Sequence, residues 1–91
     1  MPTITVKARA DTQFEVIVQD RSTTTHIVTV APDTAARLTG GKVSTEQLVR
    51  KSFEFLLERE PNTSILRSFD LTVIGRYFPE YERVIGKLLS S

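Results

Sequence analysis

The chain of 91 residues contains no cysteine and only one histidine. The absence of cysteine excludes disulfide bonds, thiolate nucleophiles and cysteine-ligated zinc or iron–sulfur centres. The one histidine, His26, ends a TTTH run and has no carboxylate or second ligand at a recognisable spacing. We therefore interpret it as structural rather than catalytic or metal-binding. The sequence predicts no cofactor and no metal site.

Long apolar runs and an excess of one charge are also missing. No stretch approaches the roughly 18 apolar residues of a membrane-spanning helix, and the opening MPTITVKARA has no apolar signal-peptide core. The 12 Lys and Arg residues balance 11 Asp and Glu residues. Net charge alone therefore gives no long-range attraction to nucleic acid or anionic lipid. We expect a cytoplasmic protein that does not bind membranes.

What the sequence does contain is typical of a small globular domain. Hydrophobic residues make up 40% of the chain and charged residues 25%, as in ordinary folded domains. A chain of this length can bury one small core but cannot form a deep cleft between two domains. We predict a single domain over residues 1–91, with a β-meander at 1–31 and a helical part at 32–91.

Period-two alternation predicts three strands in the first third of the chain. The segments are TITVKA at 3–8, QFEVIVQ at 13–19 and TTTHIVTV at 23–30, separated by short polar breaks. This pattern is typical of an antiparallel meander with one buried face. The two outer strands of such a sheet have free edges that must be protected or paired.

Two helices are predicted after the strands. Asp33 is placed to cap a short helix, which Gly40 and Gly41 end. Ser44 opens the clearest helix, because Ser-Thr-Glu-Gln matches a capping box and the apolar residues that follow recur at helical spacing. Pro61 ends this helix by disfavouring the helical conformation of the residue before it.

The last third of the chain contains shorter helical patterns. Residues 65–69 fit one helical turn, whereas 70–78 fit either helix or strand, and we favour a helix capped by Asp70. Pro79 suits the first position of the last helix, in which Tyr81 and later apolar residues recur at helical spacing. The predicted fold class is therefore α+β, with an N-terminal three-stranded antiparallel β-meander followed by packed C-terminal α-helices.

One apolar face per element gives the predicted core, and the charged helix faces are expected in solvent. The core residues are Ile4, Val6, Phe14, Val16, Val18, Val28, Val30, Val49, Phe53, Leu56, Ile65, Leu66, Phe69, Leu71, Ile74, Phe78, Val84, Ile85 and Leu88.

No arrangement of residues suits catalysis. Glu54 and Glu58 lie on the solvent side of the long helix, whereas acid–base catalysis needs sheltered carboxylates with separated pKa values. No serine stands in a GxSxG elbow, and Gly40-Gly41-Lys42 lacks the spacing of a phosphate-binding loop. We therefore predict that the protein is not an enzyme, and no small-molecule substrate is evident.

The stretch RYFPEYERV, from Arg76 to Val84, combines aromatic and charged residues around one proline. Helical spacing assigns most of it to a packed joint between two helices, with Tyr81 at the first core position of the last helix. Aromatic residues and arginine are also the types enriched at binding hot spots. The hypothesis for a partner-binding surface therefore consists of Arg76, Tyr77, Tyr81 and Arg83.

The leading functional prediction is a non-enzymatic interaction or regulatory module that acts through a protein surface or a homodimer interface. The alternative is a nucleic-acid-binding regulator, because a short helix, a glycine turn and a longer helix follow the order of a helix-turn-helix. In that alternative, Thr45, Gln47, Arg50 and Lys51 would contact bases or phosphates. A protein partner or self-association is thus expected first, and nucleic acid second.

The segment FEFLLEREP, the later residues SIL and FDL, and the element YFPEYE resemble the signature half of a group of small, uncharacterised bacterial proteins. In that group a β-rich N-terminal part precedes a Ser/Thr-capped helix. The resemblance covers about half of the chain and implies a bacterial cytoplasmic protein, without an activity, cofactor or catalytic residue. The order of elements is also loosely similar to that of HicB-type antitoxins, in which a β-meander precedes helices.

Overall fold

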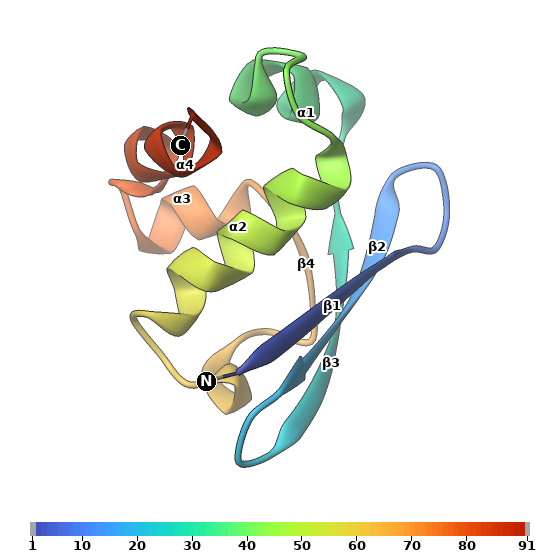
Figure 1. Cartoon of the computed structure of the whole chain (residues 1–91), viewed down its shortest axis with the longest axis vertical. Coiled ribbons are helices and arrows are strands. Elements are labelled where there is room, and N and C mark those ends of the chain that lie inside the picture. Colours follow the sequence, from blue (N-terminus) through green and yellow to red (C-terminus); the bar gives the residue numbers. More distant parts are fainter. Residues whose placement is uncertain (1, 91) are drawn as a thin grey trace.

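The computed structural model describes residues 2–90. It confirms the α+β fold class and the N-terminal antiparallel meander. Figure 1 shows the strands on one side of the molecule and the helices on the other. The elements in chain order are β1 (Thr3–Ala8), β2 (Gln13–Gln19), β3 (Thr23–Thr29), α1 (Pro32–Thr39), α2 (Thr45–Leu57), η1 (Asn62–Ser64), β4 (Ser68–Asp70), α3 (Val73–Tyr77) and α4 (Tyr81–Ser90).

The meander has one covered face because its apolar residues alternate with polar ones. β1 pairs antiparallel with β2, which places Val6 opposite Val16, and β2 pairs antiparallel with β3, which places Val16 opposite His26. Successive side chains of a strand point to opposite faces. Val16, Val18 and Val28 therefore share the covered face, each with 0% exposure. This face of the sheet is one wall of the core.

A fourth strand lies outside the predicted meander. β4 pairs parallel with β3, so that Phe69 stands opposite Val28. The amide of Ile27 donates a hydrogen bond to the carbonyl of Arg67 at 2.7 Å. This pairing satisfies backbone groups on the side of β3 that faces away from β2. The prediction of a helical turn at residues 65–69 is wrong for this reason.

The segment after β4 resolves the ambiguity at residues 70–78. Asp70 is the last residue of β4, and the helix is restricted to Val73–Tyr77. The Asp70 carboxylate accepts hydrogen bonds from the Thr72 amide at 3.0 Å and from the Thr72 hydroxyl at 2.7 Å. Asp70 therefore shapes the turn that enters α3, whereas Thr72, directly before the helix, makes no side-chain capping bond.

The caps of α1 and α2 agree with the prediction at two ends of four. Ser44 caps α2, since its hydroxyl accepts a hydrogen bond from the Gln47 amide at 3.1 Å. α2 ends at Leu57, with Glu58 as its C-cap, and therefore stops before Pro61 can act on it. Gly40 ends α1 in the left-handed conformation, with φ of 63°. The start of α1 differs, because the helix begins at Pro32 and no side chain caps it. Pro32 has the φ of a first helical residue and no amide hydrogen to satisfy, so Asp33 is not needed as a cap.

The last helix begins later than predicted. α4 starts at Tyr81, and Pro79 lies in the turn before it rather than at the first helical position. The Tyr81 amide donates to the carbonyl of Phe78 at 2.9 Å, and the Val84 amide donates to the carbonyl of Glu80 at 3.0 Å. Pro79 thus bends the chain between α3 and α4.

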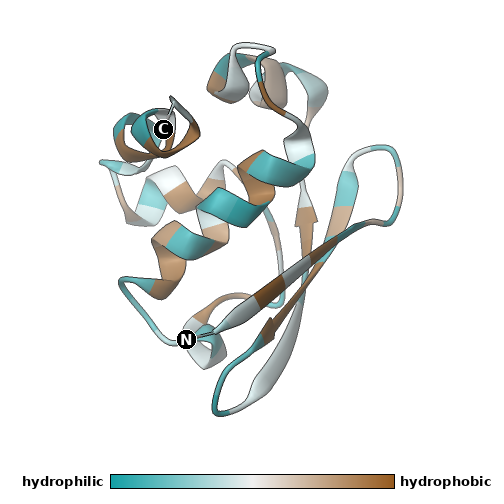
Figure 2. Cartoon of the chain, viewed as in Figure 1, coloured by the Kyte–Doolittle hydropathy of each residue, from teal (hydrophilic) through white to brown (hydrophobic). Residues whose placement is uncertain are grey.

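The helices form a layer over the covered face of the sheet (Figure 1). α2 lies centrally in this layer, in contact with β1, α1 and α4. Hydrophobic and hydrophilic bands alternate along α2 in Figure 2, and Leu48, Phe53 and Phe55 are each 0% exposed. Every predicted core residue is buried or packed against the core except Leu66, which is 49% exposed. No helix within residues 2–90 is long and apolar enough to cross a membrane.

Candidate functional site

The two tyrosines of RYFPEYERV have opposite environments. Tyr81 is 1% exposed, and its hydroxyl lies 2.6 Å from the hydroxyl of Ser52. Ser52 donates to the carbonyl of Leu48 at 2.7 Å, so the proton between the two hydroxyls comes from Tyr81. Burial raises the pKa of Tyr81 to about 12. Tyr81 belongs to the core, and its assignment to a partner-binding surface is wrong.

The rest of the joint packs around Phe55, which is missing from the predicted core yet is 0% exposed. The ring of Phe78 meets it edge to face at 5.8 Å between centroids, and the Arg59 guanidinium carbon lies 3.6 Å from its centroid. Arg59 also pairs with Glu80 at 3.4 Å. A hydrogen bond from its own amide, followed by the charges of Arg59 and Arg83, lowers the pKa of Glu80. Phe55 therefore joins α2 to the α3–α4 turn.

Three of the four residues predicted to bind a partner are at the surface. Arg76, Tyr77 and Arg83 are exposed, and Tyr77, at the end of α3, exposes 69% of its surface. Of the three, Tyr77 lines a hollow that Arg76 and Arg83 do not. The candidate site is therefore centred on Tyr77.

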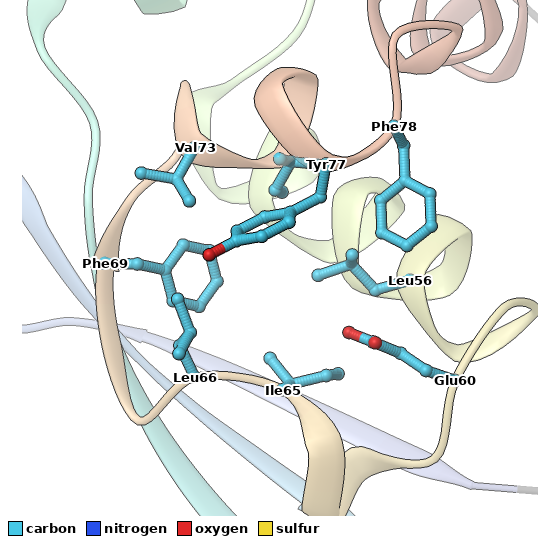
Figure 3. Close-up of a pocket in the computed structure, with 9 residues that line it drawn as sticks. Leu56, Glu60, Ile65, Leu66, Phe69, Val73, Tyr77 and Phe78 are labelled. Carbon is cyan, nitrogen blue, oxygen red and sulfur yellow. The ribbon is translucent and has the colours of Figure 1, made fainter.

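A shallow apolar hollow lies beside Tyr77, between β4, α3 and the end of α2 (Figure 3). It has a volume of about 40 Å³. The ring of Tyr77 extends over it toward Leu66 and Phe69. The residues that line this feature, called the Leu66–Tyr77 hollow from here on, are Leu56, Glu60, Ile65, Leu66, Phe69, Val73, Ile74, Tyr77 and Phe78.

A chain of hydrogen bonds holds one wall of the hollow in place. The Asn62 side-chain amide donates to the Ser22 carbonyl and to the Thr24 hydroxyl, both at 2.9 Å. His26 Nδ1 lies 2.7 Å from the carbonyl of Leu66, and its Nε2 lies 2.9 Å from the Thr24 hydroxyl. Because a carbonyl only accepts, Nδ1 carries the proton in this contact, and Nε2 can accept from Thr24. His26, 1% exposed, thus ties the segment before β4 to the sheet.

This attachment explains why Leu66 is exposed. The backbone at Ile65 is extended, with φ of −77° and ψ of 138°, and neighbouring side chains of an extended segment point to opposite sides. Ile65 is 6% exposed and Leu66 49%. A helical interpretation of residues 65–69 placed both in the core. Ile65 and Leu66 are adjacent apolar residues, and in an extended segment only one of two neighbours can point into the core. This signal in the sequence would have identified one of them as a surface residue.

Glu60 is the one charged side chain among the residues that line the hollow. Its carboxylate extends into the hollow in Figure 3. Glu54, Glu58 and Glu80 each pair with a nearby cation, whereas Glu60 has no ion pair within residues 2–90. A half-buried carboxylate on an apolar surface, without an internal cation, favours a cation supplied from outside.

Two larger hollows border the sheet. One, of about 330 Å³, is lined by Thr24, His26, Asn62 and Arg67 among others, and its His26 and Asn62 side chains are hydrogen-bonded within the fold. The other, of about 550 Å³, lies between β1 and α2. Within the described part of the chain, no cluster of three or more His, Cys, Asp or Glu residues could hold a metal. The ring nitrogens of His26 bond to a carbonyl and a hydroxyl rather than to a carboxylate.

Two of the four residues predicted to contact nucleic acid, Arg50 and Lys51, make hydrogen bonds or ion pairs within the protein. Arg50 Nη1 donates to the carbonyl of Ile4 at 2.6 Å, and Lys51 Nζ lies 3.5 Å from the Glu54 carboxylate. Thr45 and Gln47 are half-buried at the start of α2. The start of α2 therefore does not form a free cationic surface.

Comparisons with family models, with curated protein sequences and with solved structures find no match to this chain. The Leu66–Tyr77 hollow is therefore the feature from which a function is proposed.

Proposed function

We propose that this protein is a non-enzymatic interaction or regulatory module that binds a short apolar segment of a partner protein in the Leu66–Tyr77 hollow. One observation carries this proposal. Among the described residues, the two large hydrophobic side chains that are exposed, Leu66 and Tyr77, both line the same hollow. Exposed apolar residues are normally scattered singly, whereas a contiguous apolar patch with polar surroundings marks an interaction site.

The size of the hollow limits what it can bind. Sites for small molecules and cofactors enclose roughly 300–1,000 Å³, whereas this hollow has about 40 Å³. It has room for one side chain of aliphatic size. Tyr77 offers a large, rigid contact surface at its rim, and tyrosine is among the residues that contribute most to binding at protein interfaces. The geometry therefore supports an anchor residue on a partner polypeptide.

Glu60 adds a charge preference to this apolar contact. Its carboxylate lies at the hollow without an internal ion pair. A lysine or arginine next to the apolar anchor of the partner would form a charge-assisted hydrogen bond there. The preferred segment is thus an aliphatic residue with a basic neighbour.

A nucleic-acid partner is the alternative, and the charges favour it less. Arg50 and Lys51 are engaged by Ile4 and Glu54. The carboxylate of Glu60, at the Leu66–Tyr77 hollow, would repel phosphate. The bacterial and cytoplasmic setting in this proposal rests on the resemblance of FEFLLEREP and YFPEYE to small bacterial proteins.

Selection of a random peptide library on the immobilised protein tests the proposal. We expect enriched peptides that contain Leu, Ile or Val beside Lys or Arg. Their affinity should fall by at least about 10-fold in Tyr77→Ala and in Leu66→Ala, as for hot-spot residues. Glu60→Gln should retain the apolar anchor and lose the preference for a basic neighbour.

Arg76→Ala is the matched control, because Arg76 is exposed beside Tyr77 but does not line the hollow. Peptides that bind Tyr77→Ala and Leu66→Ala as tightly as the wild type would overturn the proposal, as would a selection that enriches nothing. Nuclease-sensitive nucleic acid that copurifies with the wild type and disappears from Arg50→Ala would favour the alternative.

A further inference from the structure

The outer edge of β1 has unpaired backbone groups. β1 lies at the end of the sheet, and its neighbour is β2. In an antiparallel pair, the residues of one strand alternately direct their N–H and C=O groups toward and away from the neighbour. The amide of Arg9, just after β1, donates to the carbonyl of Gln13, so the odd-numbered residues of β1 face β2. The even-numbered residues Ile4, Val6 and Ala8 therefore direct their backbone groups outward.

A contact with α2 confirms this direction. Arg50 Nη1 donates to the carbonyl of Ile4 at 2.6 Å from the side opposite β2. Within residues 2–90, the outward N–H and C=O groups of Val6 and Ala8 have no hydrogen-bond partner. A regular edge strand with such groups is a template for another strand unless it is blocked. On β1, Arg50 occupies one lone pair of the Ile4 carbonyl. The second lone pair of this oxygen can still accept a hydrogen bond.

The hollow between β1 and α2 leaves room for an added strand. It has a volume of about 550 Å³, and it is bordered by Ile4 of β1 and by Arg50, Glu54 and Leu57 of α2. An added strand would lie beside β1, with alternate side chains directed into this hollow. α2 already covers part of β1. The side chains that the added strand directs into the hollow can therefore be small.

We propose that the occupant of this edge is β1 of a second copy of the chain, paired antiparallel about a two-fold axis at Val6. Ile4 then faces Ala8 of the second copy, and each facing pair of outward residues exchanges two hydrogen bonds. The small side chain of Ala8 from the second copy lies beside Ile4, at the border of the hollow. The two sheets become one continuous sheet through an isologous interface.

The charges on β1 select this register. With the axis at Val6, Lys7 faces Thr5 of the second copy, so no like charges stand opposite. Moving the axis to Ala8 would place Lys7 opposite Arg9 of the second copy. Moving it to Ile4 would bring Pro2, which has no amide hydrogen, into the pairing.

The flank of α2 above β1 is also self-complementary. Arg50 precedes Glu54 and Glu58 among the α2 residues that border this hollow. A two-fold axis places α2 antiparallel to α2 of the second copy, so Arg50 of one copy approaches these carboxylates of the other. This complementarity favours a second copy over an unrelated strand.

Light scattering on the purified chain, coupled to size-exclusion chromatography, tests the proposal. The wild type should show twice the 10.2 kDa mass of one chain at micromolar concentration. Ala8→Pro should raise the dissociation constant by at least about 10-fold, because it removes an outward amide and puts the proline ring against the second copy. Proline is tolerated at an edge position whose amide faces solvent, so the fold should be retained.

Thr25→Pro is the matched control. Thr25 lies at the part of β3 that β4 does not cover, so proline there changes the other edge of the sheet and should leave the dimer intact. Amide exchange gives a second measure that needs no variant: the Val6 amide should become protected as the protein concentration rises. A wild type that stays monomeric, or a dimer that Tyr77→Ala disrupts and Ala8→Pro does not, would overturn the proposal.

Discussion

Tyr77 and Tyr81 stand on the two sides of Pro79, yet one exposes 69% of its surface and the other 1%. Both belong to the same aromatic and charged stretch of sequence. Tyr81 has a polar partner inside the core, Ser52, and an aromatic neighbour, Phe55, whose ring centroid lies 5.3 Å away. Tyr77 has no side-chain hydrogen bond within residues 2–90, and its ring extends over a shallow hollow.

This contrast teaches that the surroundings, rather than the residue type, separate a core tyrosine from a binding tyrosine. A buried tyrosine needs a hydrogen-bond partner for its hydroxyl, and Ser52 provides one from α2. An exposed tyrosine that lies over an apolar hollow keeps its hydroxyl in water and offers its ring to a partner. The segment RYFPEYERV is therefore both a joint and the edge of a surface.

Of the changes considered, truncation of Tyr81 should lower the free energy of unfolding the most. Tyr81→Ala removes a ring packed against Phe55 and leaves a cavity, so we expect the free energy of unfolding to fall by about 3–5 kcal/mol, as for large aromatic residues in cores. Chemical denaturation followed by circular dichroism measures this loss. A loss below about 1 kcal/mol would mean that Tyr81 is not a core residue.

The second largest effect is expected at alkaline pH, where the ionisation of buried Tyr81 should lower the stability of the fold. Burial raises the pKa of Tyr81 from 10.0 to about 12, so its neutral form is favoured in the folded state. Stability from this group is complete below pH 10.0 and is lost as the pH rises toward about 12, because the unfolded chain ionises first. The loss should reach roughly 2–3 kcal/mol.

Tyr81→Phe is the control for this pH dependence. The variant has no group to ionise at this position, so its stability should fall less steeply over the same alkaline range. Denaturant titrations at successive pH values compare the two proteins. Equal slopes for the wild type and Tyr81→Phe would contradict the assignment of the effect to Tyr81.

Truncation of Tyr77 should have the smallest effect on stability. Since 69% of the residue is exposed, Tyr77→Ala should change the free energy of unfolding by no more than about 0.5 kcal/mol, as for ordinary surface positions. The same denaturation experiment measures it, beside the expected loss of peptide binding. A loss of about 2 kcal/mol or more would show that Tyr77 is packed in the core. It would contradict the assignment of Tyr77 to the surface and Tyr81 to the core.

The parts of the fold that the sequence predicts well depend on neighbours along the chain. Alternation placed Val16 and Val18 on the covered face, and both are fully buried. The capping box placed Ser44 before α2, and the glycine at position 40 ends α1. In these cases the physical cause lies within a few residues of its effect.

The parts that the sequence did not predict depend on distant residues. β4 forms because β3 has backbone groups to pair, and His26 reaches a carbonyl 40 residues later in the chain. That attachment makes residues 65–67 extended and turns Leu66 outward. Of the three residues on which the candidate site depends, Tyr77 could therefore be found from the sequence, whereas Leu66 and Glu60 needed the tertiary pairing to be known.

The parallel attachment of β4 also has a consequence for how the molecule folds and opens. The meander closes through turns of a few residues, whereas the bond from His26 to the carbonyl of Leu66 spans 40 residues, and such long closures carry a larger entropic cost and form late. The segment from η1 to β4 is thus expected to be a separate opening unit with a lower local stability than the meander. Because the Leu66–Tyr77 hollow exists only while this unit is closed, a ligand bound there would hold the last-formed part of the protein in its native state.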